Sequence, residues 1–112
     1  MASARFARII SMKAKTGKGD EFAKEFRDGV ASTAVDIEGM RRLYLLRSVG
    51  KGDDFIVVSL WDGERAAEAY AKSGKDKRYE KRLAAVQDGK ETVKKYRVAV
   101  HVLGKGVADT EE

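Results

Sequence analysis

The chain has 112 residues, of which 23 are Lys or Arg, 18 are Asp or Glu and none is Cys. This length corresponds to one domain. The absence of cysteine excludes disulfides and thiolate metal sites and is compatible with a reducing compartment. The net charge of +5 comes from closely mixed charges, so by itself it does not indicate a nucleic-acid-binding protein.

We predict a single domain over residues 1–104 and a polar tail over residues 105–112. The first residues lack an apolar signal core, and no apolar run approaches the length of about 20 residues that a membrane-spanning helix needs. We therefore expect a cytoplasmic protein that has no membrane partner.

Residues 5–15 alternate between two faces, which predicts a first β-strand. Its apolar face carries Phe6, Ile10, Met12 and Ala14. Arg8 interrupts that face. An arginine in this place either reaches water from the end of the strand or is buried against a carboxylate or an anionic ligand. The turn at residues 16–19 has too few glycines, wrongly spaced, for a phosphate-binding loop.

From Asp20 the apolar residues follow the spacing of a helix, and we predict one continuous helix that ends before Gly39. Its apolar stripe consists of Phe22, Phe26, Gly29, Val30, Thr33 and Ile37. Gly29 lowers helix propensity by about 1 kcal/mol. We explain this glycine by a close approach of the helix to the sheet.

Two further strands, at residues 40–49 and 55–61, are joined by a hairpin loop. The second contains the longest apolar run and the only tryptophan, which indicates a central strand. Phe55, Val57, Ser59 and Trp61 point to one face of it, and Ile56, Val58 and Leu60 point to the other. Trp61 ends the strand where the sheet meets a helix, so it either packs in the core or forms the wall of a pocket.

Two helices and a last strand complete the chain. The first helix carries Ala66, Ala67, Ala69 and Tyr70 and is closed by Gly74. The second is short, is capped by Asp76, and has Tyr79, Leu83 and Val86 as its apolar stripe. The last strand covers residues 94–103 and includes His101.

The order strand, helix, strand, strand, broken helix, strand predicts a ferredoxin-like α+β sandwich built from split βαβ units. In this fold the helices cover one face of an antiparallel sheet. The other face would leave Ile56, Val58 and Leu60 exposed, so we expect a second copy of the chain to bury it. The prediction is a homodimer in which two sheets face each other.

Four segments in sequence order resemble those of the antibiotic biosynthesis monooxygenase (ABM) domain family, which belongs to the dimeric α+β barrel superfamily. They are Thr16–Phe22, Gly39–Met40 leading into Leu45–Ser48, Phe55–Trp61, and Ala66 with Tyr70. The similarity extends over residues 6–103. It implies a homodimer with a pocket between the sheet and the helices of each subunit. Members of this family include cofactor-independent oxygenases of polycyclic phenols and quinols, and also haem-degrading monooxygenases.

The resemblance also identifies candidate site residues. In the cofactor-independent oxygenases, the tryptophan that Trp61 matches lines the site with an asparagine, whose place is taken here by Val57. In the haem-degrading branch an asparagine, a tryptophan and a histidine form the site, and the matching positions here are Ile10, Tyr70 and Glu80. The missing histidine argues against haem chemistry, and we expect no cofactor and no metal. Many members have a histidine where Tyr70 stands, so Tyr70 is the best candidate for a polar group facing the pocket.

A cofactor-independent oxygenase must ionise an electron-rich phenol or quinol and hold the anion beside dioxygen in an apolar cavity. Arg8 or Arg47 would supply positive charge. Tyr70 and Tyr79 would supply walls and donors, although tyrosines at a core boundary often have hydrated hydroxyls instead. His101 is the only histidine and a candidate general base. A lone histidine on a strand is more often structural, and without further ligands it does not make a metal site.

The complete prediction for the site has Trp61, Tyr70 and His101 as catalytic residues. The residues expected to contact the substrate are Arg8, Ile10, Arg47, Val57, Ser59 and Tyr79. The basic cluster at residues 72–82 is interpreted as a solvated face. Nucleic acid is not an expected partner, because Asp53 and Asp54 lie where a nucleic-acid-binding sheet needs cations.

Two functional hypotheses remain open. The first is a small monooxygenase that oxidises an aromatic phenol or quinol with dioxygen and uses no cofactor. The alternative is a non-catalytic protein of the same fold that binds a small hydrophobic ligand. Retention of Trp61 favours the first hypothesis, whereas Val57 in place of the asparagine favours the second.

Overall fold

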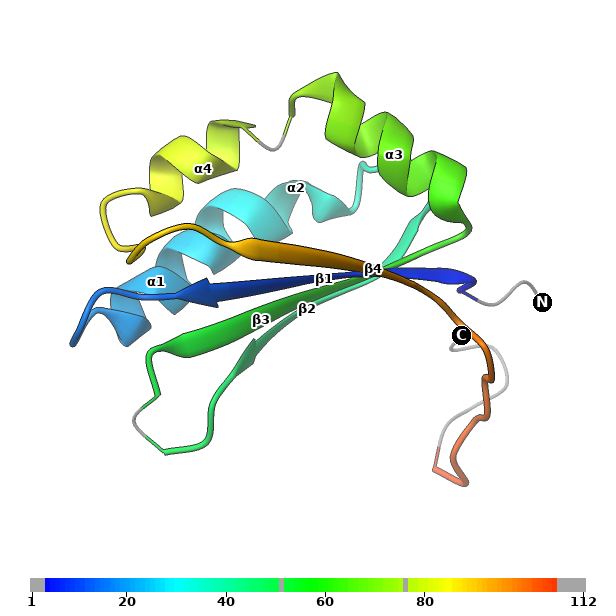
Figure 1. Ribbon diagram of the computed structural model, residues 1–112, viewed down its shortest axis with the longest axis horizontal. Helices are drawn as coiled ribbons and strands as arrows, with labels where there is room; N and C mark the ends of the chain where they lie inside the picture. The colour runs from blue at the N-terminus through cyan, green and yellow to red at the C-terminus, as the bar shows by residue number, and fades with distance from the viewer. Residues whose placement is uncertain (1–3, 51, 76, 107–112) are drawn as a thin grey trace.

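The computed structural model describes residues 4–50, 52–75 and 77–106, with the side chains of Arg78 and Tyr79 outside the described part. Four strands form one antiparallel sheet in the order β2-β3-β1-β4. They are β1 (Phe6–Lys13), β2 (Met40–Arg47), β3 (Asp54–Trp61) and β4 (Thr92–Arg97). The helical segments are α1 (Gly19–Glu25), η1 (Phe26–Ala31), α2 (Ser32–Ala34), α3 (Glu64–Ser73) and α4 (Lys77–Leu83). All of them lie on one face of the sheet (Figure 1), so the predicted ferredoxin-like α+β sandwich is confirmed.

Strand β3 occupies a central position between β2 and β1, as its long apolar run predicts. Its helix-facing residues Phe55, Val57, Ser59 and Trp61 are all buried. On the opposite face Ile56 is 40% exposed. The alternation derived from the sequence therefore assigns both faces of this strand correctly.

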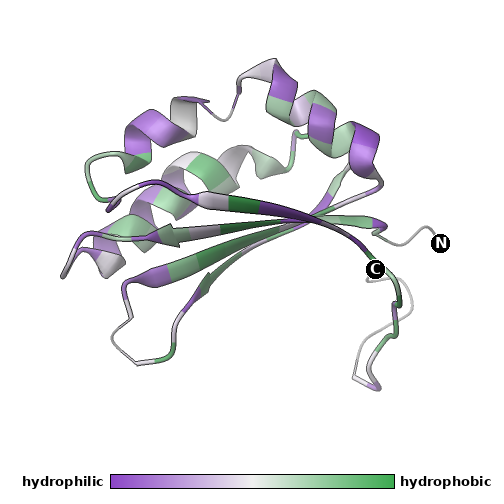
Figure 2. Cartoon of the chain, viewed as in Figure 1, coloured by the Kyte–Doolittle hydropathy of each residue, from purple (hydrophilic) through white to green (hydrophobic). Residues whose placement is uncertain are grey.

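The core under the helices is dominated by aromatic side chains. Phe22 of α1 stacks on Phe55 of β3 with ring centroids 4.6 Å apart, a contact that contributes about 0.5–1.5 kcal/mol beyond the area it buries. A second cluster contains Phe6, Trp61 and Ala67. Figure 2 shows hydrophobic residues along the strands and hydrophilic residues over much of α3 and α4, the outer layer of the sandwich.

The first helix differs from the prediction of one continuous α-helix. After α1 the chain passes into the π-helix η1 and then into the short α2, so the helical path contains a wider turn. The prediction that Gly29 allows a close approach to the sheet is also wrong. A Cβ at Gly29 would contact the side chain of Arg82, which belongs to α4 rather than to the sheet. Arg82 in turn donates a hydrogen bond to Glu25, at 2.6 Å, and so joins α4 to α1.

The last strand is shorter than predicted. It ends at Arg97, which pairs with Phe6 at the start of β1, so β1 offers no further residue for a longer ladder. Beyond a hydrogen bond from the Val98 N–H to the Arg5 carbonyl, the segment 98–106 leaves the sheet (Figure 1). Val100 and Val102 are each 79% exposed. The end of the predicted polar tail, residues 107–112, and the predicted cap Asp76 lie outside the described residues.

Two glycines next to the ends of elements adopt left-handed conformations. Gly74 closes α3 with a φ of 75°, as predicted. Gly39 leads into β2 with a φ of 83°, and a Cβ on it would contact the side chain of Ala66. Because both the dihedral and the contact require the absence of a side chain, Gly39 fixes how closely α3 packs on the entrance to β2.

Within the described ranges, none of the helices has the length and apolar character required to span a membrane.

Candidate functional site

A cavity of about 120 Å³ lies between the sheet and its helical layer. The sheet contributes residues from all four strands or their ends, and η1, α3 and α4 contribute the opposite wall. Most of its wall is apolar and includes Ile10, Met12, Phe26, Val30, Leu43, Val57, Leu83 and Val93. Its polar lining residues are Arg8, Ser59, Trp61, Tyr70, Glu80 and Glu91. The cavity is thus suited to a small hydrophobic ligand with a few oriented polar groups.

Trp61 is fixed in the wall of this cavity by a buried hydrogen bond. Its side chain is fully buried, and its Nε1–H donates to Ser59 Oγ at 2.9 Å. The Ser59 hydroxyl is itself 3.4 Å from the carbonyl oxygen of Arg8, to which it donates. Both interpretations offered for Trp61 are therefore correct, because the same side chain packs in the core and lines the cavity.

Tyr70 comes to the cavity from α3, where it follows Ala67 by three residues on the face that packs against the sheet. Its ring lies 5.6 Å from that of Trp61 at a tilt of 39°. Tyr70 and Ile37 also line a second, more open groove between α3 and the segment that precedes β2. These two side chains therefore form the partition between the inner cavity and the outer groove.

Arg8 is the charged residue of the cavity wall on β1. It is half-buried in the third position of the strand, and its Nε is buried without a hydrogen-bond partner among the described residues. Moving a charged group out of water without a partner is unfavourable. The structure places Arg8 between the two interpretations from the sequence: its side chain is half-buried with the Nε out of water, and no carboxylate of the described residues pairs with it.

Ile10, Val57 and Ser59 also line the cavity, as predicted from the alternation of β1 and β3. Glu91 is a lining residue that the sequence analysis missed. It was missed because the last strand begins at Thr92 rather than at residue 94, so the start of β4 was assigned too late. The available signal was the alternation Glu91, Val93, Lys95, which continues the helix-facing side of the strand.

Two predicted site residues lie away from the cavity. Arg47 is at the hairpin end of β2, where its guanidinium pairs with Asp20 at 2.8 Å, donates to the Gly52 carbonyl and lies 5.4 Å from the centre of the Phe55 ring. His101 is exposed in the segment that follows β4. Neither residue lines the cavity of the single chain, since Arg47 has partners of its own and the strand ends before His101. The side chain of Tyr79 lies outside the described residues.

Over the described ranges, no group of three or more His, Cys, Asp or Glu side chains is arranged to hold a metal ion.

Comparison with known families agrees with the fold and the cavity. The family model described as antibiotic biosynthesis monooxygenase matches residues 5–82, which is more than half of the chain. The chain belongs to this family. The matched part of this ABM protein runs from the start of β1 into α4, so it contains most of the cavity wall and leaves out Leu83, Glu91 and Val93. A search of curated proteins found no match.

Solved structures share the fold of this ABM protein at low sequence identity. A monooxygenase from the gene ActVA-Orf6 of Streptomyces coelicolor, in complex with the ligand nanaomycin D, has a TM-score of 0.76 at 11% identity and covers 91% of this chain and 94% of its own. A mutant of SnoaB, a cofactor-independent oxygenase from Streptomyces nogalater, has a TM-score of 0.74 at 15% identity and covers 89% and 98%. A protein of unknown function from Nitrosomonas europaea has a TM-score of 0.75 at 15% identity and covers 95% and 100%.

Proposed function

We propose that this ABM protein is a cofactor-independent monooxygenase that oxidises a small aromatic phenol or quinol with dioxygen. The observation that carries the proposal is the apolar cavity in which Trp61 and Tyr70 form aromatic walls beside Arg8, whose Nε has no partner among the described residues. Membership in the ABM family and the similarity in fold to a named cofactor-independent oxygenase support it.

The oxidation requires little from the protein beyond an apolar cavity with a fixed cation. Ionisation of the substrate makes it electron-rich enough to reduce dioxygen, and a fixed cation stabilises the oxyanion in a dry site. In this proposal Arg8 faces the oxyanion, and Trp61 and Tyr70 hold the ring. For an anthrone, a methylene group becomes a carbonyl, one oxygen atom enters the product and the other leaves as water. The substrate supplies all the electrons, so no external reductant is needed.

We also propose that the protein acts as a homodimer through the uncovered face of its sheet. That face exposes Tyr44, Leu46, Ile56 and Tyr96, which are each between 40% and 49% exposed. Neighbouring side chains of this kind form an apolar surface that a second copy would remove from water. The extended apolar segment 98–106 projects on the same side of the sheet (Figure 1) and would add to the contact.

The test is dioxygen uptake by the metal-free protein with a panel of naphthols, anthrones and quinols. We expect uptake with one substrate class and formation of one quinone for each dioxygen consumed. Trp61→Phe should lower turnover while the protein remains folded. Tyr44→Phe, which changes an aromatic residue on the other face of the sheet, is the matched control and should retain turnover.

A non-catalytic binding protein is the second candidate, and Val57 favours it because an apolar side chain stands where the resemblance places a polar asparagine. Its signature would be quenching of Trp61 fluorescence by an aromatic ligand with no dioxygen uptake for any member of the panel. Uptake that is unchanged in Trp61→Phe would instead remove Trp61 from the reaction.

A further inference from the structure

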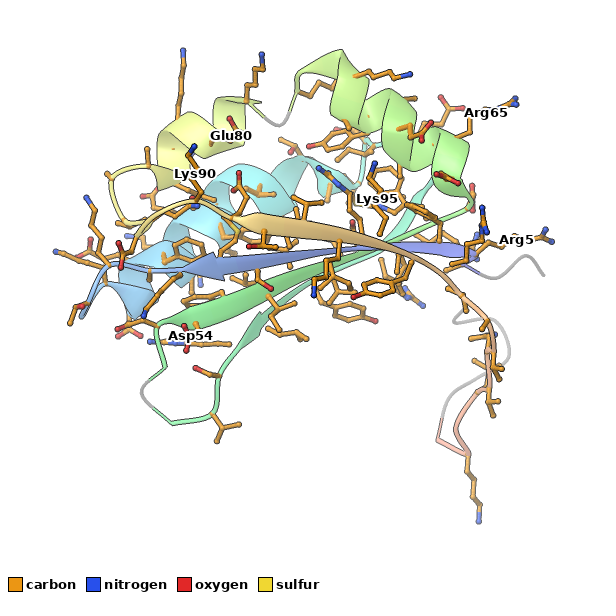
Figure 3. The ribbon with its side chains drawn as sticks, viewed as in Figure 1. Arg5, Asp54, Arg65, Glu80, Lys90 and Lys95 are labelled. Carbon is orange, nitrogen blue, oxygen red and sulfur yellow. The ribbon has the colours of Figure 1, made fainter. Side chains whose placement is uncertain are left out.

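Two cations stand directly opposite each other on the helix-covered face of the sheet. In the register of β1 and β4, Arg8 pairs with Lys95, and side chains in such a pair lie on the same face about 5 Å apart at Cβ. Figure 3 shows Lys95 on the side of β4 that faces α3. Like charges in directly opposed positions destabilise a sheet. The pair therefore needs an explanation other than strand pairing.

No ion pair within the described residues neutralises these two charges. The ion pairs of the described chain use Lys18, Arg27, Arg41, Arg47, Arg82 and Arg97 as cations. Arg97 is the next helix-facing cation on β4, and it already has Glu64 as a partner at 3.9 Å. Arg8 lines one end of the apolar cavity, and Lys95, which is exposed and outside the lining, pairs with it across the strands, so the two form a local charge of +2 beside that end. The buried Nε of Arg8 belongs to this pair of cations.

The opposite end of the cavity has the opposite charge. Glu91 lines it immediately before Thr92, which pairs with Ser11. Ser11 is three residues from Arg8, or about 10 Å along the strand. Glu80 of α4, labelled in Figure 3, is the other lining carboxylate. An anionic group is therefore attracted to the Arg8 end and repelled from the Glu91 end, and a ligand with one acidic edge has a single favoured orientation.

We infer that the substrate is a hydroxyaromatic acid, with a carboxylate on the same edge of the ring as the reacting hydroxyl. The inference rests on the proposed function, because one cation suffices for a phenolate and the second requires a second anionic oxygen group. Arg8 faces the reacting oxyanion, Lys95 binds the carboxylate at the edge of the cavity, and Glu80 and Glu91 exclude the reverse orientation.

The experiment measures the binding of 1-hydroxy-2-naphthoate and 1-naphthol by quenching of Trp61 fluorescence at low ionic strength. Both probes have the same ring and hydroxyl, and only the first has the carboxylate. We expect the wild-type protein to bind the acid about two- to fivefold more tightly than the naphthol, the magnitude of an exposed charge pair. Lys95→Met should remove this preference and leave naphthol binding unchanged.

Lys94→Met is the matched control, since Lys94 neighbours Lys95 in sequence but pairs with Ile9 on the other face of the sheet. It should keep the full preference for the acid. Equal binding of both probes by the wild-type protein, or an acid preference that survives Lys95→Met, would overturn the inference.

Dioxygen uptake measured with the same two probes separates this inference from the proposed function. A preference for the acid that depends on Lys95, without uptake by these probes or by any member of the panel of naphthols, anthrones and quinols, would refute the oxygenase and keep the anion site. Uptake with naphthol but without preference for the acid would keep the oxygenase and refute the anion site. Absence of binding by either probe would contradict the inferred anion site.

Discussion

The hydrogen bond between Trp61 and Ser59 gives the sharpest test of how the cavity wall is held. Ser59→Ala removes the oxygen that accepts the Trp61 Nε1–H at 2.9 Å and changes little else, because Ser59 is itself only 4% exposed and small. The indole N–H then lies in a fully buried place without this acceptor. A buried donor left unsatisfied costs about 1–3 kcal/mol, so we expect Ser59→Ala to lower the free energy of unfolding by that amount.

A double-mutant cycle isolates this bond from the packing of the indole. In Trp61→Phe the donor is already absent, and the Ser59 hydroxyl keeps only its long contact of 3.4 Å to the Arg8 carbonyl. In that background Ser59→Ala should therefore cost less than about 1 kcal/mol. The coupling energy between the two positions is expected to be about 1 kcal/mol or more, in the range measured for residues in contact.

The assay is urea unfolding followed by far-UV circular dichroism, which does not depend on Trp61 as a probe. All variants are compared at one protein concentration, because association would add to the apparent stability. Ser11→Ala is the control, since this exposed serine of β1 should change the stability by less than about 0.5 kcal/mol. Equal costs of Ser59→Ala in the wild-type and Trp61→Phe backgrounds would show that the bond does not hold the indole, and the reasoning would be refuted.

Three further predictions test the fold and the placement of residues. Gly39→Ala should lower the free energy of unfolding in urea by about 3 kcal/mol, because the new side chain meets a steric contact at a positive φ. Gly50→Ala is the control: it has the strained φ alone and should lower the free energy by about 1 kcal/mol. Equal costs for the two variants would contradict the close packing at Gly39. Arg47→Met should lower the free energy of unfolding by about 1 kcal/mol or less and leave naphthol binding unchanged. A loss of naphthol binding would show that Arg47 contributes to the site. Ile56→Lys should give a monomer in analytical ultracentrifugation. Val35→Lys is the control and should leave the dimer intact, because Val35 is 87% exposed and lies outside the sheet. An unchanged sedimentation coefficient for Ile56→Lys would contradict the proposed dimer.

The sequence predicts the sheet well because alternation is a local property. Phe55, Val57 and Trp61 face the helices in the structure as their period of two requires. The same alternation extended through Val98, Val100 and Val102 and predicted a longer last strand. A strand also needs a partner of matching length, and that length is set by where β1 begins, which no pattern within residues 98–103 reveals.

Apart from Tyr70 of α3, the site was predicted only in the part that the sheet determines. Arg8, Ile10, Val57, Ser59 and Trp61 lie on two adjacent strands, so their common face followed from alternation and pairing. Arg47 has the same parity, but Asp20, far away in sequence, pairs with it at the hairpin end. Whether an arginine is free to bind a ligand or is already paired depends on such tertiary contacts. Spacing along the chain does not predict them.

The π-helix has a consequence for how the cavity is shaped. Phe26 and Val30, at positions one and five of η1, both reach the cavity wall, and the turn that joins them is wider than an α-helical one. Deleting a single residue from η1 would replace this wide turn with a regular α-helical one, while the later helical residues keep nearly the same orientation toward the sheet. The number of residues in this one turn thus sets how the backbone bulges at the cavity wall, and so acts as a dimension of the binding site.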